Sequence, residues 1–155
     1  MNTEQFAQHV EALRPRLYRT ALCYLGNQHD ALEVLDESVY RALCGLKKLR
    51  QPEFFATWMS RILINECSRE LKRRNRFLPL EKRKETAAED LDLLPLQEAV
   101  RALPTELKEV VILRYFSGYT QAETAETLGV PQGTVATRQR RALQLLKLEL
   151  KEDAE

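Results

Sequence analysis

Long apolar runs are missing from this 155-residue chain. No stretch approaches the roughly 20 consecutive apolar residues that a membrane-spanning helix needs. Residues 1–5 also lack the basic and then apolar pattern that opens a secretory signal. We therefore expect a protein that does not insert directly into a membrane and that works in the cytoplasm.

Cysteine and histidine are scarce as well. The 3 cysteines lie far apart without a Cys-x-x-Cys pair, and an odd number in a cytoplasmic chain argues against a disulfide framework. The 2 histidines, His9 and His29, have no partners at the spacing of metal ligands. The sequence also lacks a glycine-rich phosphate loop and a nucleophile–base pair. We therefore expect neither a metal nor another cofactor, and we do not expect an enzyme.

Glycine, proline and aromatic residues are few, whereas 30% of the residues are charged. This composition favours a helical protein over a sheet protein. The net charge of +1 argues against nucleic-acid binding over the whole surface. The charges are unevenly distributed, however, because basic residues crowd residues 69–84 and acidic residues follow at 85–92. A local basic patch of this kind can bind DNA even when the total charge is near zero.

Apolar residues recur at intervals of three and four along the first half of the chain, which predicts three helices. The first covers residues 3–25, and Pro15 is expected to kink it or to split it. The second starts at Asp30 and covers 31–49, and the third covers 53–74. The residues of the second helix that we expect to face the core are Leu32, Leu35, Val39, Leu43 and Leu46.

The segment 77–94 differs from both flanking regions. It is charged, it has Pro79 and Pro95 near its edges, and it shows no sustained apolar period. We interpret it as a flexible linker between a first domain, 1–76, and a second domain, 95–155. The expected fold class is therefore all-α, with two small helical domains, the second of which contains a helix-turn-helix.

Residues 119–146 have the pattern of that helix-turn-helix. Thr120 followed by Glu123 is a capping box, which starts a helix. Gly129 suits the left-handed residue that ends this helix, and Pro131 suits the first turn of the next one. An ordinary helical hairpin with a solvated basic face has the same pattern. The small alanines of the first helix, which allow the two helices to cross closely, favour DNA binding.

The second helix of this motif has one apolar and one polar face. The polar face carries short residues first and arginines one turn later. Such a helix end can approach base edges closely while its arginines reach bases or phosphates. The residues of this face are Ala136, Thr137, Arg140, Arg141 and Gln144.

Nearly the whole chain resembles the bacterial sigma factors of the extracytoplasmic-function group, the smallest members of the sigma-70 family. Residues 30–43 resemble the helix with which the family binds core polymerase. Residues 55–67 are similar to the Phe-x-Thr-Trp-x-x-Arg-Ile motif of its promoter-melting helix, and residues 103–116 and 129–138 resemble its last domain. Two independent motifs in this order, with a linker and no middle domain, are more specific than a helix-turn-helix alone.

The resemblance implies a sigma factor that binds core RNA polymerase and directs initiation at specific promoters. It further implies regulation in response to stress or an envelope signal, under the control of an anti-sigma factor, often a membrane-anchored one. Within polymerase, the implied contacts are with the beta-prime coiled coil and the beta flap. Carried over to this sequence, Asp36 and Glu37 match polymerase-binding positions. The positions that match contacts with the upstream, minus-thirty-five element are Ala136, Thr137, Arg138, Arg140 and Arg141.

The resemblance also assigns residues to the melting of the minus-ten element. Arg61 and Asn65 would hold an unstacked base, since stacking and a polar pocket can offset the few kcal/mol that extrusion costs. The residues that would contact phosphates are Lys72, Arg73, Arg74 and Arg76. Read without the resemblance, this run is a basic helix end. Phe55 and Trp58, at helical spacing, are expected in the core.

Several positions depart from the family's common pattern. Ala136 stands where Lys or Arg is frequent, and Asp36 replaces a frequent Gln. Gln139 and Thr124 stand where large apolar residues are usual, which predicts a less tightly packed recognition helix. These departures concern the promoter sequence rather than the class of protein.

A free-standing transcription regulator with a helix-turn-helix is the alternative interpretation. Such a regulator needs a dimer interface in order to read paired half-sites. The first half of the sequence shows no long heptad seam that would supply one.

Overall fold

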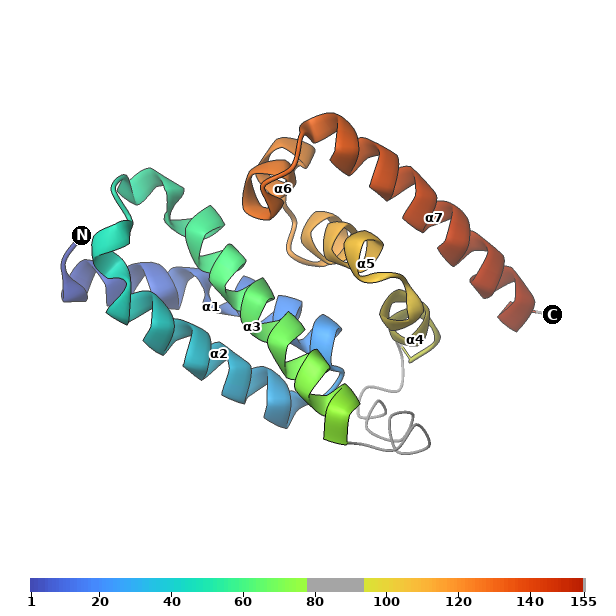
Figure 1. The fold of residues 1–155 in the computed structure, drawn as a ribbon, viewed down its shortest axis with the longest axis horizontal. Helices are drawn as coiled ribbons and strands as arrows, with labels where there is room; N and C mark the ends of the chain where they lie inside the picture. Colours follow the sequence, from blue (N-terminus) through green and yellow to red (C-terminus); the bar gives the residue numbers. More distant parts are fainter. Residues whose placement is uncertain (78–93, 155) are drawn as a thin grey trace.

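The computed structural model describes residues 1–77 and 94–154, and its regular structure within these ranges is entirely helical (Figure 1). The helices of the first half are α1 (Thr3–Leu25), α2 (Gln28–Cys44) and α3 (Phe55–Phe77), with short 3₁₀ turns η1 (Leu46–Lys48) and η2 (Pro52–Phe54) between the last two. Those of the second half are α4 (Leu94–Ala102), α5 (Thr105–Val111), the π-helical η5 (Ile112–Phe116), α6 (Gln121–Leu128) and α7 (Gln132–Ala154). The all-α prediction is confirmed.

The predicted linker 77–94 lies outside the described residues except for its two ends, which belong to α3 and α4. The division of the chain into domains 1–76 and 95–155 stays a prediction. Within the described ranges, no helix combines the length and the apolar character that crossing a bilayer requires.

Helix α1 begins at a capping box and ends at a left-handed glycine. The Asn2 side chain accepts a hydrogen bond from the Gln5 amide at 2.8 Å, and Gln5 accepts one from the Asn2 amide at 3.0 Å. Gly26, with φ of 81°, closes the other end. Pro15 does not split the helix, which runs through it without interruption and packs against both α2 and α3.

Helix α2 corrects two expectations from the sequence. It starts before Asp30, because Asn27 is the cap and accepts a hydrogen bond from the Asp30 amide at 2.8 Å. Its core-facing side is also rotated, since Leu32 and Leu43 are 43% and 41% exposed. The residues that it buries include small ones, which allow the three helices to approach closely; they are Ala31, Val34, Leu35, Ser38 and Ala42.

The helix-turn-helix has the predicted local structure. Thr120 and Glu123 form both hydrogen bonds of the capping box, at 3.1 and 3.0 Å. Gly129 ends α6 in the left-handed region with φ of 69°. Before this motif, α5 continues directly into the π-helical turn η5, whose end is marked by a hydrogen bond from the Ser117 amide to the Ile112 carbonyl at 2.9 Å.

The two halves pack against each other. Helix α6 lies beside α3, while η5 and α4 contact α1 (Figure 1). One apolar core runs through both halves, and a smaller cluster of Val110, Ala125 and Val135 holds the helix-turn-helix together. Helix α7 lies on the outer side of the second half, away from α1 to α3 (Figure 1).

Candidate nucleic-acid and polymerase interfaces

Helix α7 exposes most of its residues that the sequence analysis assigned to the upstream element. Thr137, Arg140 and Arg141 are exposed, and Ala136 is half-buried. The opposite face of the helix buries Val135, Ala142 and Leu146 in the core. Within the described part of the chain, neither Arg140 nor Arg141 forms an ion pair, so both guanidinium groups can accept an anionic partner.

Arg138 differs from these two arginines. It points toward α5, where it forms an ion pair with Glu106 at 3.7 Å, and only 23% of its side chain is exposed. Burial raises the pKa of the neighbouring Glu109, and the charge of Arg138 partly opposes that effect. Arg138, Arg141 and Thr137 border a hollow of about 420 Å³ between α5 and α7. Arg138 therefore lies at the rim of the presented face.

Gln139 links three elements of the second half. Its side-chain oxygen accepts hydrogen bonds from Arg114 at 3.1 Å and Gln121 at 3.2 Å. Its side-chain nitrogen donates to the Tyr115 hydroxyl at 2.8 Å. Arg114 also donates to the Tyr119 carbonyl at 2.5 Å. A polar network thus occupies the position at which a large apolar residue is usual in the family's pattern.

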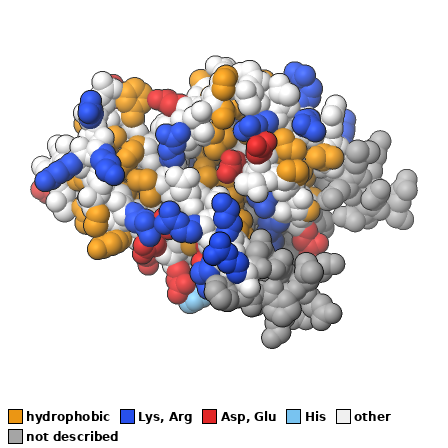
Figure 2. Space-filling view, in the orientation of Figure 1, with side chains coloured by type: hydrophobic (Ala, Val, Ile, Leu, Met, Phe, Trp, Pro, Cys, Tyr) orange, Lys and Arg blue, Asp and Glu red, His pale blue; other side chains and the backbone are white. Residues whose placement is uncertain are grey.

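The basic run of α3 is partly neutralised within the protein. Arg73 forms a two-pronged hydrogen bond with Glu70, at 2.9 and 2.6 Å, and Arg69 pairs with Glu66 at 3.2 Å. Lys72 and Arg76 are exposed and form no ion pair among the described residues. On the face shown in Figure 2, Lys and Arg side chains gather over the C-terminal part of α3, with acidic side chains beside them.

Arg74 is held inside the first half. Its guanidinium pairs with the Asp30 carboxylate and donates to the Leu25 carbonyl at 2.9 Å, and 13% of the side chain is exposed. Burial alone raises the pKa of Asp30, but the hydrogen bond from Asn27 and the charge of Arg74 outweigh it and leave that pKa below its ordinary value. Arg74 thus ties the end of α3 to the start of α2.

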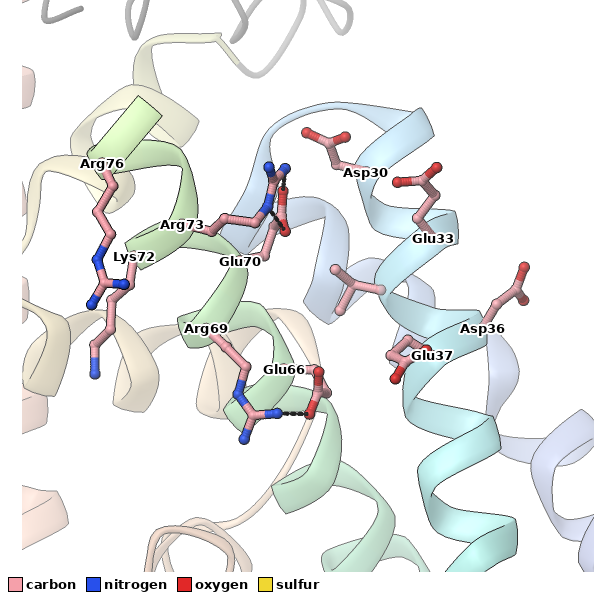
Figure 3. Close-up of a pocket in the computed structure, with 11 residues that line it drawn as sticks. Asp30, Glu33, Asp36, Glu37, Glu66, Arg69, Glu70, Lys72, Arg73 and Arg76 are labelled. Atoms are coloured by element: carbon pink, nitrogen blue, oxygen red, sulfur yellow. Dashed lines mark hydrogen bonds and ion pairs between the residues drawn. The ribbon is translucent and has the colours of Figure 1, made fainter. Parts of the chain in front are cut away.

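Helix α2 presents an acidic surface next to this basic run. Asp36 and Glu37 are exposed, and Glu37 pairs with Arg41 at 3.0 Å. A groove of about 770 Å³ separates the carboxylates of α2 from the basic side chains of α3 (Figure 3).

Three large apolar side chains of α2 face solvent beside Asp36, and the sequence reasoning did not find them as a surface. Leu32, Tyr40 and Leu43 are 43%, 63% and 41% exposed. Their spacing of eight and three residues places them on the same side of the helix as Asp36. Their helical spacing with Asp36 could have indicated this surface, but the two leucines were assigned to the core.

The side chains of Arg61 and Asn65 lie in different environments. Asn65 lines a hollow of about 260 Å³ together with Trp58 and Ile62. The guanidinium of Arg61 instead lies against Gly129 of the second half. Phe55 is buried, with its ring 5.8 Å from that of Phe6, as expected for a core residue.

One cluster near the start of α2 has the composition of a weak cation site. Ligand atoms of His29, Asp30 and Glu33 lie within 4.8 Å of one another. The Asp30 carboxylate, however, already accepts hydrogen bonds from Arg74 and Asn27. This cluster is therefore engaged in holding α2 to α3.

Comparison with known proteins identifies the family. The sigma-70 region 2 family matches residues 9–77, and the sigma-70 region 4 family matches residues 93–146. RNA polymerase sigma factor SigV of Bacillus subtilis is 35% identical over 145 residues, which cover 88% of this chain and 86% of SigV. ECF RNA polymerase sigma factor SigM of Mycobacterium tuberculosis, strain Erdman, is 31% identical, covering 91% of this chain and 80% of SigM.

Among solved structures, CnrH in complex with the cytosolic domain of CnrY has the same fold. It is 25% identical with a TM-score of 0.77, and the match covers 98% of this chain and 91% of CnrH. The order of regions 2 and 4, the identities and the fold agree with the resemblance found in the sequence. The chain belongs to the extracytoplasmic-function group of the sigma-70 family, and it is a sigma factor rather than an enzyme.

Proposed function

We propose that this sigma factor binds core RNA polymerase and directs initiation at a specific set of promoters from the cytoplasm. The observation that carries the proposal is the pairing of regions 2 and 4 in one chain, each with its own charged surface. A free-standing regulator would need only the second region and a dimer interface.

The polymerase contact is proposed at the α2 surface made of Leu32, Asp36, Glu37, Tyr40 and Leu43. The carboxylates suit the basic and polar surface expected of the beta-prime coiled coil, and the exposed apolar side chains beside them can be buried in the contact. The beta flap is the partner expected for the second half.

The upstream element is proposed to be read by the outer face of α7. Arg140 and Arg141 are exposed without an ion pair among the described residues, so they supply the charge, while Ala136 and Thr137 permit a close approach. Arg138 is proposed to contact a phosphate at the edge of this surface after exchanging Glu106 for it.

The melting surface is proposed at the other long basic helix, α3. Its phosphate contacts rest on Lys72 and Arg76, with Arg73 as a paired neighbour, whereas Arg74 contributes through the position of α3. Asn65 and Arg61 are proposed to hold an extruded base.

Control by an anti-sigma factor is part of the proposal. The family implies such a partner, and CnrH was solved with the cytosolic domain of a second protein, CnrY. A cytosolic domain of a membrane-anchored protein is therefore the kind of partner that we expect to bind this chain.

Gel filtration with core polymerase, followed by mapping of transcription starts, tests the proposal. We expect the chain to migrate with core polymerase and the complex to start transcription at defined sites. Asp36→Lys is expected to weaken polymerase binding with the fold intact, whereas Glu4→Lys, at an exposed position of α1, serves as the matched charge reversal. A chain that ignores polymerase and binds palindromic DNA as a dimer would establish the alternative.

A further inference from the structure

The polar side chains at positions 138 and 139 of helix α7 are held by neighbouring elements of the protein. Arg138 forms its ion pair with Glu106 of α5 at 3.7 Å. The side-chain oxygen of Gln139 accepts hydrogen bonds from Arg114 and Gln121 at 3.1 and 3.2 Å. Both side chains are therefore already engaged before DNA approaches.

Thr137 directs its hydroxyl back along the helix. Its Oγ1 atom donates a hydrogen bond to the Gly133 carbonyl at 3.0 Å, which is the bond to the carbonyl four residues earlier that threonine often forms in a helix. Because Oγ1 and the methyl group Cγ2 are the two branches of the same Cβ atom, the methyl group points away from that carbonyl. The side chain is exposed, so it presents a methyl group rather than a free proton to solvent.

The surroundings of this methyl group are open. A helical side chain leans toward the N-terminus of its helix, so that of Thr137 lies over the turn that contains Gly133. Gly133 is exposed, and a Cβ atom at this position would meet no atom outside its own helix within 4 Å. The neighbouring Ala136, which is half-buried, ends in a methyl group as well. We call the Ala136 Cβ and the Thr137 Cγ2 the methyl pair, and a base edge can approach it closely.

Thymine supplies the apolar group that suits the methyl pair. In the major groove the base pairs differ in their donors and acceptors, and the 5-methyl group of thymine is the apolar feature among them. Alanine and the threonine methyl group are typical contacts of that group. Arg140 and Arg141 follow within about one turn and can donate to guanine or to phosphate. The outer face of α7 thus has an apolar end and a cationic end.

We propose that the methyl pair reads the 5-methyl group of a thymine in the upstream element, and that Thr137 determines this specificity through its methyl group rather than its hydroxyl. The inference rests on the proposed function, which assigns the outer face of α7 to this element. A serine at position 137 would keep the hydroxyl and lose the contact, whereas a valine would keep the contact and lose the hydroxyl.

Uracil scanning tests the proposal with the full-length chain and core polymerase. The probe is a duplex of a promoter at which this complex starts transcription, in which each thymine of the upstream element, on either strand, is replaced in turn by uracil. This change removes the 5-methyl group and keeps the base pair. We expect at least one replacement to weaken binding of the complex by about fourfold, the effect of leaving one methyl group in water. Replacements outside both promoter elements should have no effect.

Two variants of Thr137 identify the atom that reads the base. In Thr137→Val the ratio of the affinities for the thymine and uracil duplexes should stay near about fourfold, whereas in Thr137→Ser it should fall toward one. Thr3→Ser removes a methyl group from an exposed threonine at the start of α1 and is the matched control, which should keep the ratio of the unmodified chain. Because each variant is judged by a ratio, a general change in its affinity or stability does not affect the comparison.

The proposal would be overturned if no uracil replacement weakened binding while base-pair substitutions in the same element did. It would also be overturned if Thr137→Ser kept the ratio and Thr137→Val lost it, because the hydroxyl would then read the base. Equal ratios in the two variants would likewise exclude the Thr137 methyl group as the reading atom. In each of these cases binding still depends on the upstream element, so the proposed function stands. If replacing the whole element left binding and initiation unchanged, the proposed function of α7 would fail instead.

Discussion

Helices α3 and α7 have the same length of 23 residues and both carry a run of basic side chains, yet they present different charges. In α3, Arg69, Arg73 and Arg74 each form an ion pair with a carboxylate of the first half. In α7, Arg140 and Arg141 form none among the described residues. A count of basic residues therefore does not measure the charge that a helix offers to DNA.

The difference originates in the placement of acidic residues. Helix α3 has Glu66 and Glu70 three residues before Arg69 and Arg73, which is the spacing of an ion pair along a helix. Residues 132–148 of α7 contain no Asp or Glu. Helix α3 thus neutralises part of its own positive charge. In α7, the ion pair to a carboxylate among the described residues comes from Glu106 of α5, which pairs with Arg138.

Arg74→Ala is the change expected to have the largest effect. It removes the ion pair of the Asp30 carboxylate, which keeps only its hydrogen bond from Asn27, and it removes the side-chain donor to the Leu25 carbonyl, in a site where Arg74 is 13% exposed. We expect the free energy of unfolding to fall by about 2–3 kcal/mol, as measured by urea denaturation. Arg73→Ala, which removes an exposed pair, is the control and should change it far less. Equal effects of the two variants would remove the distinction drawn for these arginines.

Acid provides a second measure of the same pair. Because the pKa of Asp30 is below its ordinary value in the folded protein, the stabilisation is present above the unfolded pKa and disappears as the pH falls through the folded pKa. The free energy of unfolding of the unmodified chain should therefore fall more steeply at acid pH than that of Arg74→Ala. Identical pH profiles would show that Asp30 gains nothing from Arg74.

Arg141→Ala is expected to weaken binding to the upstream element by about 1–3 kcal/mol if the guanidinium reads a base. The reason is that Arg141 has no internal partner among the described residues to compensate for its loss. The measurement is the affinity of the polymerase complex for promoter DNA with and without the upstream element. Unchanged affinity and selectivity would exclude this residue from the DNA contact.

Lys72→Ala is expected to weaken promoter binding uniformly across sequences and to reduce its salt dependence by about one unit of slope. Arg73→Ala should have a smaller effect, since Glu70 already occupies that guanidinium. Titrations at several salt concentrations compare the two variants. A larger effect of Arg73→Ala would mean that its ion pair opens freely on DNA.

The elements set by local sequence were predicted, and those set by tertiary packing were not. The capping box of Thr120 and the left-handed Gly129 follow from short-range rules, and the structure has both. The rotated face of α2 does not, because the packing of α2 against α1 and α3 decides which side is buried, and that side carries small residues such as Ser38. Arg74 was assigned to phosphates because its partner Asp30 lies 44 residues away in the sequence.

Gln139 affects how the recognition helix α7 packs, as well as the polar groups around it. The family pattern predicted looser packing there, but the side chain instead forms hydrogen bonds with Arg114, Tyr115 and Gln121. Gln139→Leu removes these bonds while adding apolar contact beside Val135, so the two effects oppose each other.

We expect the loss of hydrogen bonds to prevail by about 1 kcal/mol in the free energy of unfolding, because Arg114 and Gln121 would each lose an acceptor. Gln139→Glu, which keeps an acceptor for Arg114, should retain more of the stability, although its negative charge should weaken binding to the upstream element. Urea denaturation and upstream-element affinity measure the two quantities. If Gln139→Leu proved more stable than the unmodified chain, the polar network would not stabilise the fold. The position of α7 would then depend on the buried residues Val135, Ala142 and Leu146 alone.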